Sequence, residues 1–285
     1  MGTRRRNGAR PGAAQPSALT EQLDRAWSQF ADEGSEAAAA WLAGLTARQR
    51  EDPDVRLLSA AVQLERGYAR EAWAELAARA AALATESEPL ADYYRALALC
   101  DLGRFGEAEA RLAALDPEDF APGAIEYQRA VAAEFAGRTA AAEHHYAAAA
   151  AADPQAYRPP LRMASEAFAV ALEEARAALP DELQAALADV PVVVEPAPPP
   201  AMLALLIDDG FAPDLLGLFV GRNLREESVF EVPDVPPAIY LFQRNLERAA
   251  GDRAELVAEI ATTLYHELGH YLGLDEEDLK ELGVD

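Results

Sequence analysis

Hydrophobic positions recur at helical spacing through the first half of the chain. From residue 19 to about residue 160 the sequence is rich in alanine and leucine and poor in β-branched residues. Apolar side chains three to four positions apart lie on one side of a helix. Alanine and leucine also have high intrinsic helix propensity. We therefore expect this region to be all helical.

Glycine and alanine repeat along this helical region. The glycines are spaced 33, 36 and 34 residues apart, at Gly34, Gly67, Gly103 and Gly137. An alanine stands five residues after each of them, at Ala39, Ala72, Ala108 and Ala142. Glycine adopts a left-handed turn without strain, so it can end the first helix of a pair. A small alanine allows two helices to cross closely. The pattern predicts a stack of helical hairpins.

The period and the segments LALCDLGRFGEAEARL and AVAAEFAGRTAAAEHHY resemble tetratricopeptide repeats. The resemblance extends over about 135 residues, with irregular spacing between the units. It implies a solenoid whose concave surface holds a peptide or a protein partner. The alternative is a stack that serves only to pack against the next domain.

The hydrophobic pattern changes beyond residue 160. Phe168, Leu172, Ala175 and Leu179 keep helical spacing up to Pro180, and a second helix is expected from Asp181. Short apolar runs then predict three strands, over Val190–Glu195, Leu215–Gly221 and Ala238–Gln243. Pro196–Pro200 is expected to be a loop. The fold class is therefore α+β, with an all-helical region followed by a small mixed domain.

These patterns divide the chain into three parts. We expect a disordered basic tail over residues 1–18, helical repeats over residues 19–160 and a small α+β domain over residues 161–285. The tail carries four arginines and no acidic residue. No apolar run follows this basic start, so we do not expect a secretory signal.

The last long helix carries the candidate chemistry. Asp252 is a suitable N-cap, Glu255 stands three residues later as in a capping box, and Gly273 should end the helix. One side carries an apolar stripe of Leu256, Ile260, Leu264, Leu268 and Leu272. The segment between residues 266 and 270 reads HELGH, a match to HExxH.

The spacing in HExxH suits a metal site. Residues four apart on a helix differ by about 40° around the axis, so His266 and His270 can share one zinc ion. Glu267 can reach a water molecule bound to that ion without coordinating it. Zinc lowers the pKa of the water, and Glu267 can then act as the general base in attack on a peptide carbonyl. Two idle surface histidines are the alternative.

The third metal ligand is less defined by the pattern. The string HELGHYLGLDE has the form HExxHxxGxxE, which places Glu276 where a third ligand is needed. A turn at Gly273 would bring the following residues back toward the metal. Asp275 is the alternative ligand, although it is also a suitable N-cap for a short terminal helix. A site without a third protein ligand is the remaining alternative.

Four segments together resemble the minimal zincin family of bacterial metallopeptidases. They read LPDELQAALADVPVVVE, LLGLFVG, PPAIYLFQRNLE and ELVAEIATTLYHELGHYLGLDEEDLKELG. The resemblance implies zinc binding, an acidic third ligand at Glu276, and a small sheet packed on helices. It also implies that the strand before the active helix, here Ala238–Gln243, forms the sheet edge to which an extended substrate adds. No methionine follows Met202, so the methionine turn of metzincins is absent.

Composition excludes several classes of function. The chain has 49 acidic and 25 basic residues and a formal net charge of −24, so we expect no nucleic-acid partner. The longest apolar runs are too short to span a bilayer, which needs about 18 residues, so no membrane partner is expected. Cys100 is the single cysteine and excludes an internal disulfide. We expect a cytoplasmic protein.

Two functional hypotheses follow. The first is a zinc-dependent metallopeptidase that hydrolyses peptide bonds of a peptide or protein substrate, with the repeats binding a substrate or partner. The second is a non-catalytic, repeat-based interaction protein whose zinc site is structural or vestigial. A closed coordination sphere without an open position would favour the second.

Overall fold

The computed structural model describes residues 17–83, 88–224, 228–230 and 238–281. Contacts divide the chain into two compact units. The first comprises Met1–Arg158 and Ile207–Ala212, and the second comprises Pro159–Leu206 and Pro213–Asp285. The predicted tail is outside the described residues up to residue 16, and Ser17 caps the first helix.

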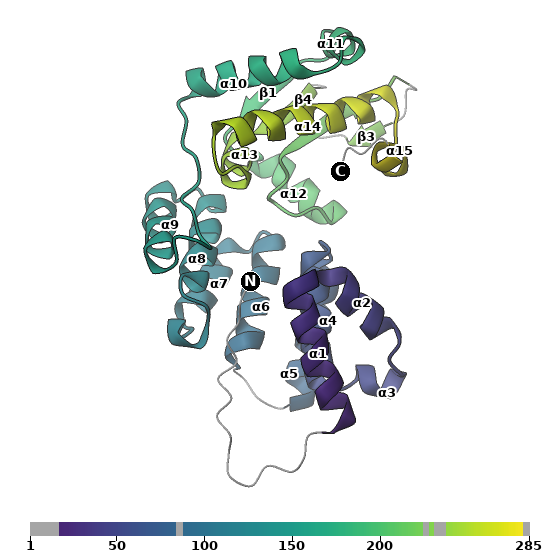
Figure 1. Ribbon diagram of the computed structural model, residues 1–285, viewed down its shortest axis with the longest axis vertical. Coiled ribbons are helices and arrows are strands. Elements are labelled where there is room, and N and C mark those ends of the chain that lie inside the picture. The colour runs from purple at the N-terminus through teal and green to yellow at the C-terminus, as the bar shows by residue number, and fades with distance from the viewer. Residues whose placement is uncertain (1–16, 84–87, 225–227, 231–237, 282–285) are drawn as a thin grey trace. The chain divides into compact units, whose positions relative to one another are not determined.

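The first unit is a series of helical hairpins (Figure 1). The pairs are α1 (Ala18–Glu33) with α2 (Ser35–Ala43), α4 (Pro53–Glu65) with α5 (Ala69–Leu83), α6 (Pro89–Asp101) with α7 (Phe105–Ala113), and α8 (Ala124–Phe135) with α9 (Thr139–Ala152). A short helix α3 (Ala47–Arg50) and a 3₁₀ turn (Pro117–Asp119) lie between hairpins. This part of the chain is helical, as its hydrophobic pattern predicted.

The repeating glycines end the first helix of each hairpin. Their φ angles lie between 72° and 83°, a left-handed region that favours glycine. Three of the predicted alanines, Ala72, Ala108 and Ala142, are at most 1 % exposed. In the first hairpin the fully buried residue is Ala38 rather than the predicted Ala39. The reason is that α2 begins one residue after its glycine, whereas the later second helices begin two residues after theirs.

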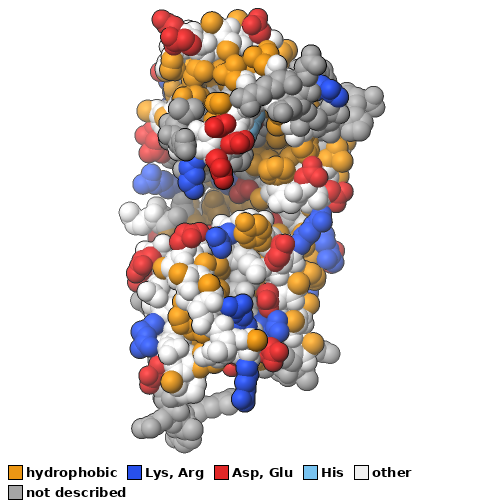
Figure 2. Space-filling model, turned by 90° about the vertical axis from the view of Figure 1, so that its right-hand side faces the viewer, with side chains coloured by type: hydrophobic (Ala, Val, Ile, Leu, Met, Phe, Trp, Pro, Cys, Tyr) orange, Lys and Arg blue, Asp and Glu red, His pale blue; other side chains and the backbone are white. Residues whose placement is uncertain are grey.

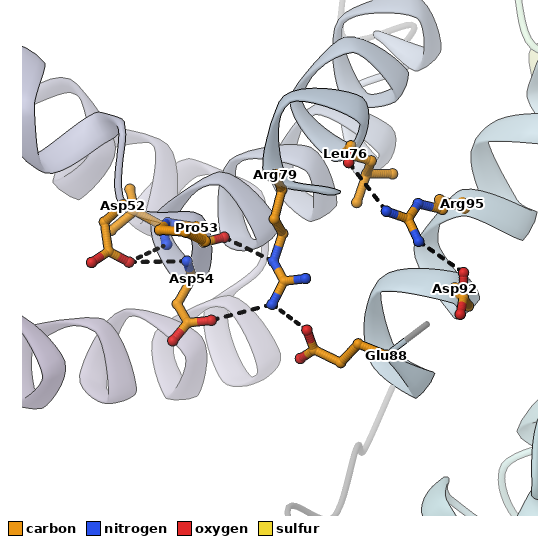
Figure 3. Close-up of polar contacts among 9 residues, drawn as sticks. Asp52, Pro53, Asp54, Leu76, Arg79, Glu88, Asp92 and Arg95 are labelled. Carbon is orange, nitrogen blue, oxygen red and sulfur yellow. Dashed lines mark hydrogen bonds and ion pairs between the residues drawn. The ribbon is translucent and has the colours of Figure 1, made fainter. Parts of the chain in front are cut away.

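A buried arginine connects two neighbouring hairpins (Figure 3). Arg79 of α5 is 2 % exposed, and its Nε donates to the carbonyl oxygen of Pro53 at 2.9 Å. Its Nη2 forms ion pairs with Asp54 at 3.3 Å and with Glu88, the N-cap residue of α6. One guanidinium thus joins α4, α5 and the start of α6, because it has donors enough for several acceptors.

The second unit contains a four-stranded mixed sheet in the order β1-β4-β2-β3. The strands are β1 (Val192–Glu195), β2 (Gly217–Arg222), β3 (Ser228–Phe230) and β4 (Ala238–Phe242). The helices are α10 (Ser165–Ala178), α11 (Asp181–Leu187), α12 (Pro200–Asp209), α13 (Gln243–Ala249), α14 (Arg253–Leu272) and α15 (Glu276–Glu281). The α+β class predicted from the sequence is confirmed.

Alternating side chains of the strands form two cores, one on each face of the sheet. Phe219, Ile239 and Leu241 point to the face covered by α10 and α14, where they join one large apolar cluster. Leu218 and Tyr240 point to the opposite face, against Met202 and Leu206 of α12. This follows from the two-residue period of a strand. Burial on both faces explains why the strands are nearly continuous apolar runs.

The strand before the active helix is not at the sheet edge. The resemblance predicted an edge at Ala238–Gln243, and this prediction is wrong. β4 pairs in parallel with β1 on one side, with Val192 opposite Ile239, and antiparallel with β2 on the other, with Leu218 opposite Tyr240. The edge strands are β1 and β3. Backbone groups of β4 are therefore used within the sheet and do not offer an open ladder to a substrate.

Three elements of this unit were not predicted. The sequence pattern predicts no helix over α12, whose first residue Pro200 lies at the end of the predicted loop, and none over α13. It also predicts no strand over β3. Within the described residues, no helix is both long and apolar enough to cross a bilayer. Figure 2 shows acidic and basic side chains lying close to one another on the visible surface.

Candidate metal centre

Capping residues set both ends of the helix that carries HExxH. The Asp252 carboxylate accepts from the backbone N–H groups of Ala254 and Glu255, as expected of an N-cap. Glu255 accepts from the N–H of Gly251 at 2.7 Å, one residue before the N-cap that a capping box would use. Gly273 ends α14 with φ 89° and ψ 23°, where the sequence predicted the stop. These caps make α14 a single helix of 20 residues.

The apolar stripe of α14 fixes its orientation on the sheet. Leu256, Ile260, Leu264 and Leu268 are fully buried in the large cluster beneath β2 and β4. Gly217 allows the close approach, because a Cβ there would lie 2.5 Å from Cγ2 of Thr263. A glycine inside a strand run is a signal of such an approach, and the run LLGLFVG contains it.

The two histidines of the motif meet as the spacing predicted. Nε2 of His266 and Nε2 of His270 are 3.1 Å apart, and the ring centroids are 4.8 Å apart. Two nitrogen ligands of a tetrahedral zinc ion, each about 2.0–2.1 Å from it, stand about 3.3 Å apart. The observed separation is within a few tenths of an ångström of that spacing. The pair therefore fits the donor set of a zinc site.

A backbone carbonyl defines the tautomer of His270. Nδ1 of His270 lies 3.2 Å from the carbonyl oxygen of Leu274. A carbonyl oxygen only accepts, so the proton of the neutral ring is on Nδ1 and the Nε2 lone pair faces His266. Ligand histidines commonly have such an outer hydrogen bond. The turn at Gly273 supplies the carbonyl by folding residue 274 back toward the helix, where the Leu274 N–H donates to the Gly269 carbonyl at 2.9 Å.

Glu267 faces the sheet and is 7 % exposed. Its Oε2 accepts from the backbone N–H of Phe219 in β2 at 2.6 Å. That N–H is available because β4 bonds the alternate residues of β2, while β3 pairs only with Gly221 and Arg222. The carboxylate thus occupies the stretch of the β2 ladder that β3 leaves open. No sequence pattern indicates this contact, since it depends on strand order.

Gly269, between the two histidines of α14, is in contact with α15. A Cβ at Gly269 would lie 2.4 Å from Cδ2 of Leu279, which is 0 % exposed. Leu279 belongs to α15, so the missing side chain lets α15 pack directly on α14. This contact holds the start of α15, residue 276, to the same helix as the two histidines.

The structure describes the surroundings of one of the two candidates for the third ligand. Asp275 is an N-cap, because its Oδ1 accepts from the N–H groups of Glu277 and Asp278 at 3.0 and 2.9 Å. Glu276 is the first residue of α15, and its side chain lies outside the described part of the structure. Among the described side chains, no group of three or more His, Cys, Asp or Glu residues is arranged to hold a metal.

Two tyrosines near the motif belong to the surrounding core. Tyr271 packs its ring against Phe219, with centroids 5.6 Å apart. Tyr240 lies on the α12 face of the sheet, and burial together with the charge of Glu195 raises the pKa of its hydroxyl. Neither contact identifies an electrophile for an oxyanion.

Comparison with known proteins is consistent with this geometry. Residues 187–284 match the family model described as zincin-like metallopeptidase. No curated protein matches the chain. The matched range includes all four strands, the HExxH helix and α15. The C-terminal third of this protein is thus similar to the zincin-like metallopeptidases.

Proposed function

We propose that this protein is a zinc-dependent metallopeptidase. The proposal rests mainly on one observation. The Nε2 atoms of His266 and His270 lie 3.1 Å apart on one face of α14, and the residue after His266 is the buried Glu267. The match of residues 187–284 to zincin-like metallopeptidases supports it. The substrate would be a peptide or an unfolded protein segment.

His266, His270 and Glu276 would hold the metal. The hydrogen bond from His270 Nδ1 to the Leu274 carbonyl favours the tautomer that presents Nε2. Glu276 is preferred over Asp275, because the Asp275 carboxylate already caps α15. When bound, zinc would supply a Lewis acid that polarises the substrate carbonyl and lowers the pKa of water.

Glu267 would move the proton. As general base it takes a proton from the attacking water, and as general acid it returns that proton to the leaving amine. The Phe219 N–H would hold one carboxylate oxygen, and the fixed carboxylate loses little conformational entropy on reaching its working position. An extended substrate would pair with an edge strand, for which β3 is the candidate nearest the open stretch of β2.

The helical unit would bind the substrate or a protein partner. Its hairpins with left-handed glycines support an interpretation as degenerate tetratricopeptide-like repeats. Stacked hairpins present an extended surface for such a ligand.

Metal content and hydrolysis test this function separately. Elemental analysis of the wild-type protein should give one zinc per chain, and His266→Ala should lose it, while the exposed His144→Ala on α9 should retain it. Against a panel of unfolded proteins, Glu267→Gln should reduce hydrolysis by about 10²–10⁴-fold and keep the zinc. Glu259→Gln, two turns earlier on α14, is the matched control and should remain active.

A non-catalytic interaction protein with a structural zinc site is the second candidate. The burial of Glu267 and its bond to the β2 backbone favour this reading. It predicts stoichiometric zinc, unfolding of the second unit on chelation, and no difference between wild type and Glu267→Gln on any substrate. That result would leave zinc binding intact and overturn the peptidase.

A further inference from the structure

The two histidines of HExxH lie on the flank of α14 that faces β3. On a helix with about 100° per residue, His270 lies about 60° and His266 about 100° from Glu267, in the same direction around the axis. The buried leucines of the apolar stripe lie in the opposite direction. Glu267 itself bonds the Phe219 N–H, on the side of β2 that faces away from β4. The histidines, which are only half-buried, therefore lie on the β3 side of the sheet.

β3 places an exposed valine on this side of the sheet. Phe230 belongs to the apolar cluster on the α12 face, so Val229, the residue before it, points to the α14 face by the two-residue period of a strand. Val229 is 39 % exposed. Gly221 pairs with Phe230 and Arg222 with Ser228, which leaves Val229 without a residue opposite it in β2. Such bulges are frequent next to active sites, where they re-aim a side chain.

A leucine just beyond the end of β2 adds to this apolar surface. Leu224 is 60 % exposed, and its N–H donates to the Tyr271 carbonyl at 2.8 Å. Tyr271 directly follows His270, so this bond holds Leu224 at the turn of α14 that carries the second histidine. Among the described residues of the second unit, the strongly exposed large apolar side chains are Leu224, Val229 and, on α10, Val170. Two of the three thus belong to the segments that flank the metal centre.

We propose that Val229 and Leu224 form an apolar subsite beside the metal centre, which selects an apolar side chain of the substrate next to the scissile peptide bond. Contact with these two residues removes apolar surface of the substrate from water, which stabilises the complex. A polar side chain of similar size, such as asparagine in place of leucine, would lose hydration there without gaining a hydrogen bond. This inference rests on the proposed peptidase function and names the class of substrate for the same site.

Peptide hydroxamates test the subsite without turnover, because the hydroxamate group binds zinc and affinity is measured in place of hydrolysis. One probe, Ac-Ala-Leu-NHOH, carries leucine before the metal-binding group, and a second, HONH-CO-CH₂-CO-Leu-Ala-NH₂, carries it after. Each has a counterpart with asparagine in place of leucine. In isothermal titration calorimetry with the zinc-loaded full chain, at least one leucine probe should bind about tenfold more tightly than its asparagine counterpart.

Three variants connect this preference to the two residues. The double variant Val229→Thr/Leu224→Asn makes both side chains polar at similar size, and should bring the ratio of leucine to asparagine affinity close to one. Val229→Ile keeps an apolar side chain and should preserve the ratio. Val170→Thr changes an exposed valine of α10 and is the matched control, which should also preserve it. Because the substituted side chains are exposed, zinc content and urea midpoint should remain those of the wild type.

The subsite and the peptidase can fail separately. The subsite is overturned if leucine and asparagine probes bind equally, if the double variant keeps the wild-type ratio, or if no probe binds at millimolar concentration. Equal binding together with hydrolysis that depends on Glu267 would remove the subsite and leave the peptidase. A leucine preference that the double variant abolishes, without hydrolysis of any substrate, would leave the subsite and overturn the peptidase.

Discussion

The two units of this protein reach their structures by different routes. In the first unit, each helix packs mainly against the helices next to it in sequence. In the second, β1 pairs with β4, whose residues lie 47 positions away, and α14 packs on both β2 and α10. Local packing makes a fold that sequence spacing describes well. Long-range packing makes a fold in which the position of each side chain depends on strand order.

The candidate site shares the core of the second unit. Leu264 and Leu268, which lie on either side of His266 and Glu267 along α14, are fully buried in its large apolar cluster. Glu267 itself bonds to β2, and Gly269 contacts α15. We therefore expect changes in this core to alter metal binding, whereas changes in the first unit should remain local.

A matched pair of leucine truncations tests this contrast most strongly. Leu264→Ala and Leu112→Ala each remove a side chain that is 0 % exposed, and each should lower the free energy of unfolding by about 2–5 kcal/mol. All three tryptophans, Trp27, Trp41 and Trp73, lie in the first unit, so their fluorescence reports that unit. Leu112→Ala should shift the fluorescence-detected urea midpoint. Leu264→Ala should lower the urea midpoint detected by circular dichroism and weaken zinc binding. The urea midpoint detected by tryptophan fluorescence should be nearly unchanged.

Equal shifts of the fluorescence midpoint in both variants would mean that the chain unfolds as one cooperative body. The contrast between local and long-range packing would then have no energetic consequence.

Alanine substitutions at two helical glycines should change the free energy of unfolding by smaller amounts and in opposite directions. Gly269→Ala places a Cβ 2.4 Å from Leu279, so it should destabilise the second unit by about 1–3 kcal/mol and reduce zinc affinity by displacing α15. Gly106 in α7 has nothing within 4 Å of its added Cβ, so Gly106→Ala should stabilise the first unit by about 0.5–1 kcal/mol. Urea unfolding and a competition assay with a zinc chelator measure both effects. A stabilising Gly269→Ala with normal zinc affinity would contradict the packing of α15 at the site.

Alkaline pH should weaken the first unit by a smaller amount. Burial raises the pKa of the Cys100 thiol from 9.0 to about 12, and burial also raises the pKa of Tyr93 and Tyr94. The folded state then keeps protons that the unfolded state releases, so stability falls as the pH rises through the window from about 9 to about 12. Between pH 8 and pH 10 the thiol alone should account for about 1 kcal/mol of lost stability. The fluorescence-detected urea midpoint measures this loss of stability. In Cys100→Ala the loss between pH 8 and pH 10 should be smaller.

Part of the fold was predictable because its determinants are local. Glycine at fixed intervals predicted the hairpin turns, and Asp252 and Gly273 predicted both ends of α14, since capping depends on a few neighbouring residues. The three longer strands were predicted to within two residues at each end. β3 has three residues, so its pattern is too short to be recognised. The apolar run of α12 is continuous and gives no stripe that distinguishes a helix from a strand.

The sequence by itself determined that two imidazoles would lie on one face of a helix, because helical periodicity is a property of consecutive residues. It also determined where that helix begins and ends. Only the tertiary structure decided that β4 is interior, that Glu267 bonds to the N–H of Phe219, and that Leu279 fills the space above Gly269. These contacts join residues 10 to 48 positions apart. Their partners are selected by strand order and core packing, which no local pattern encodes.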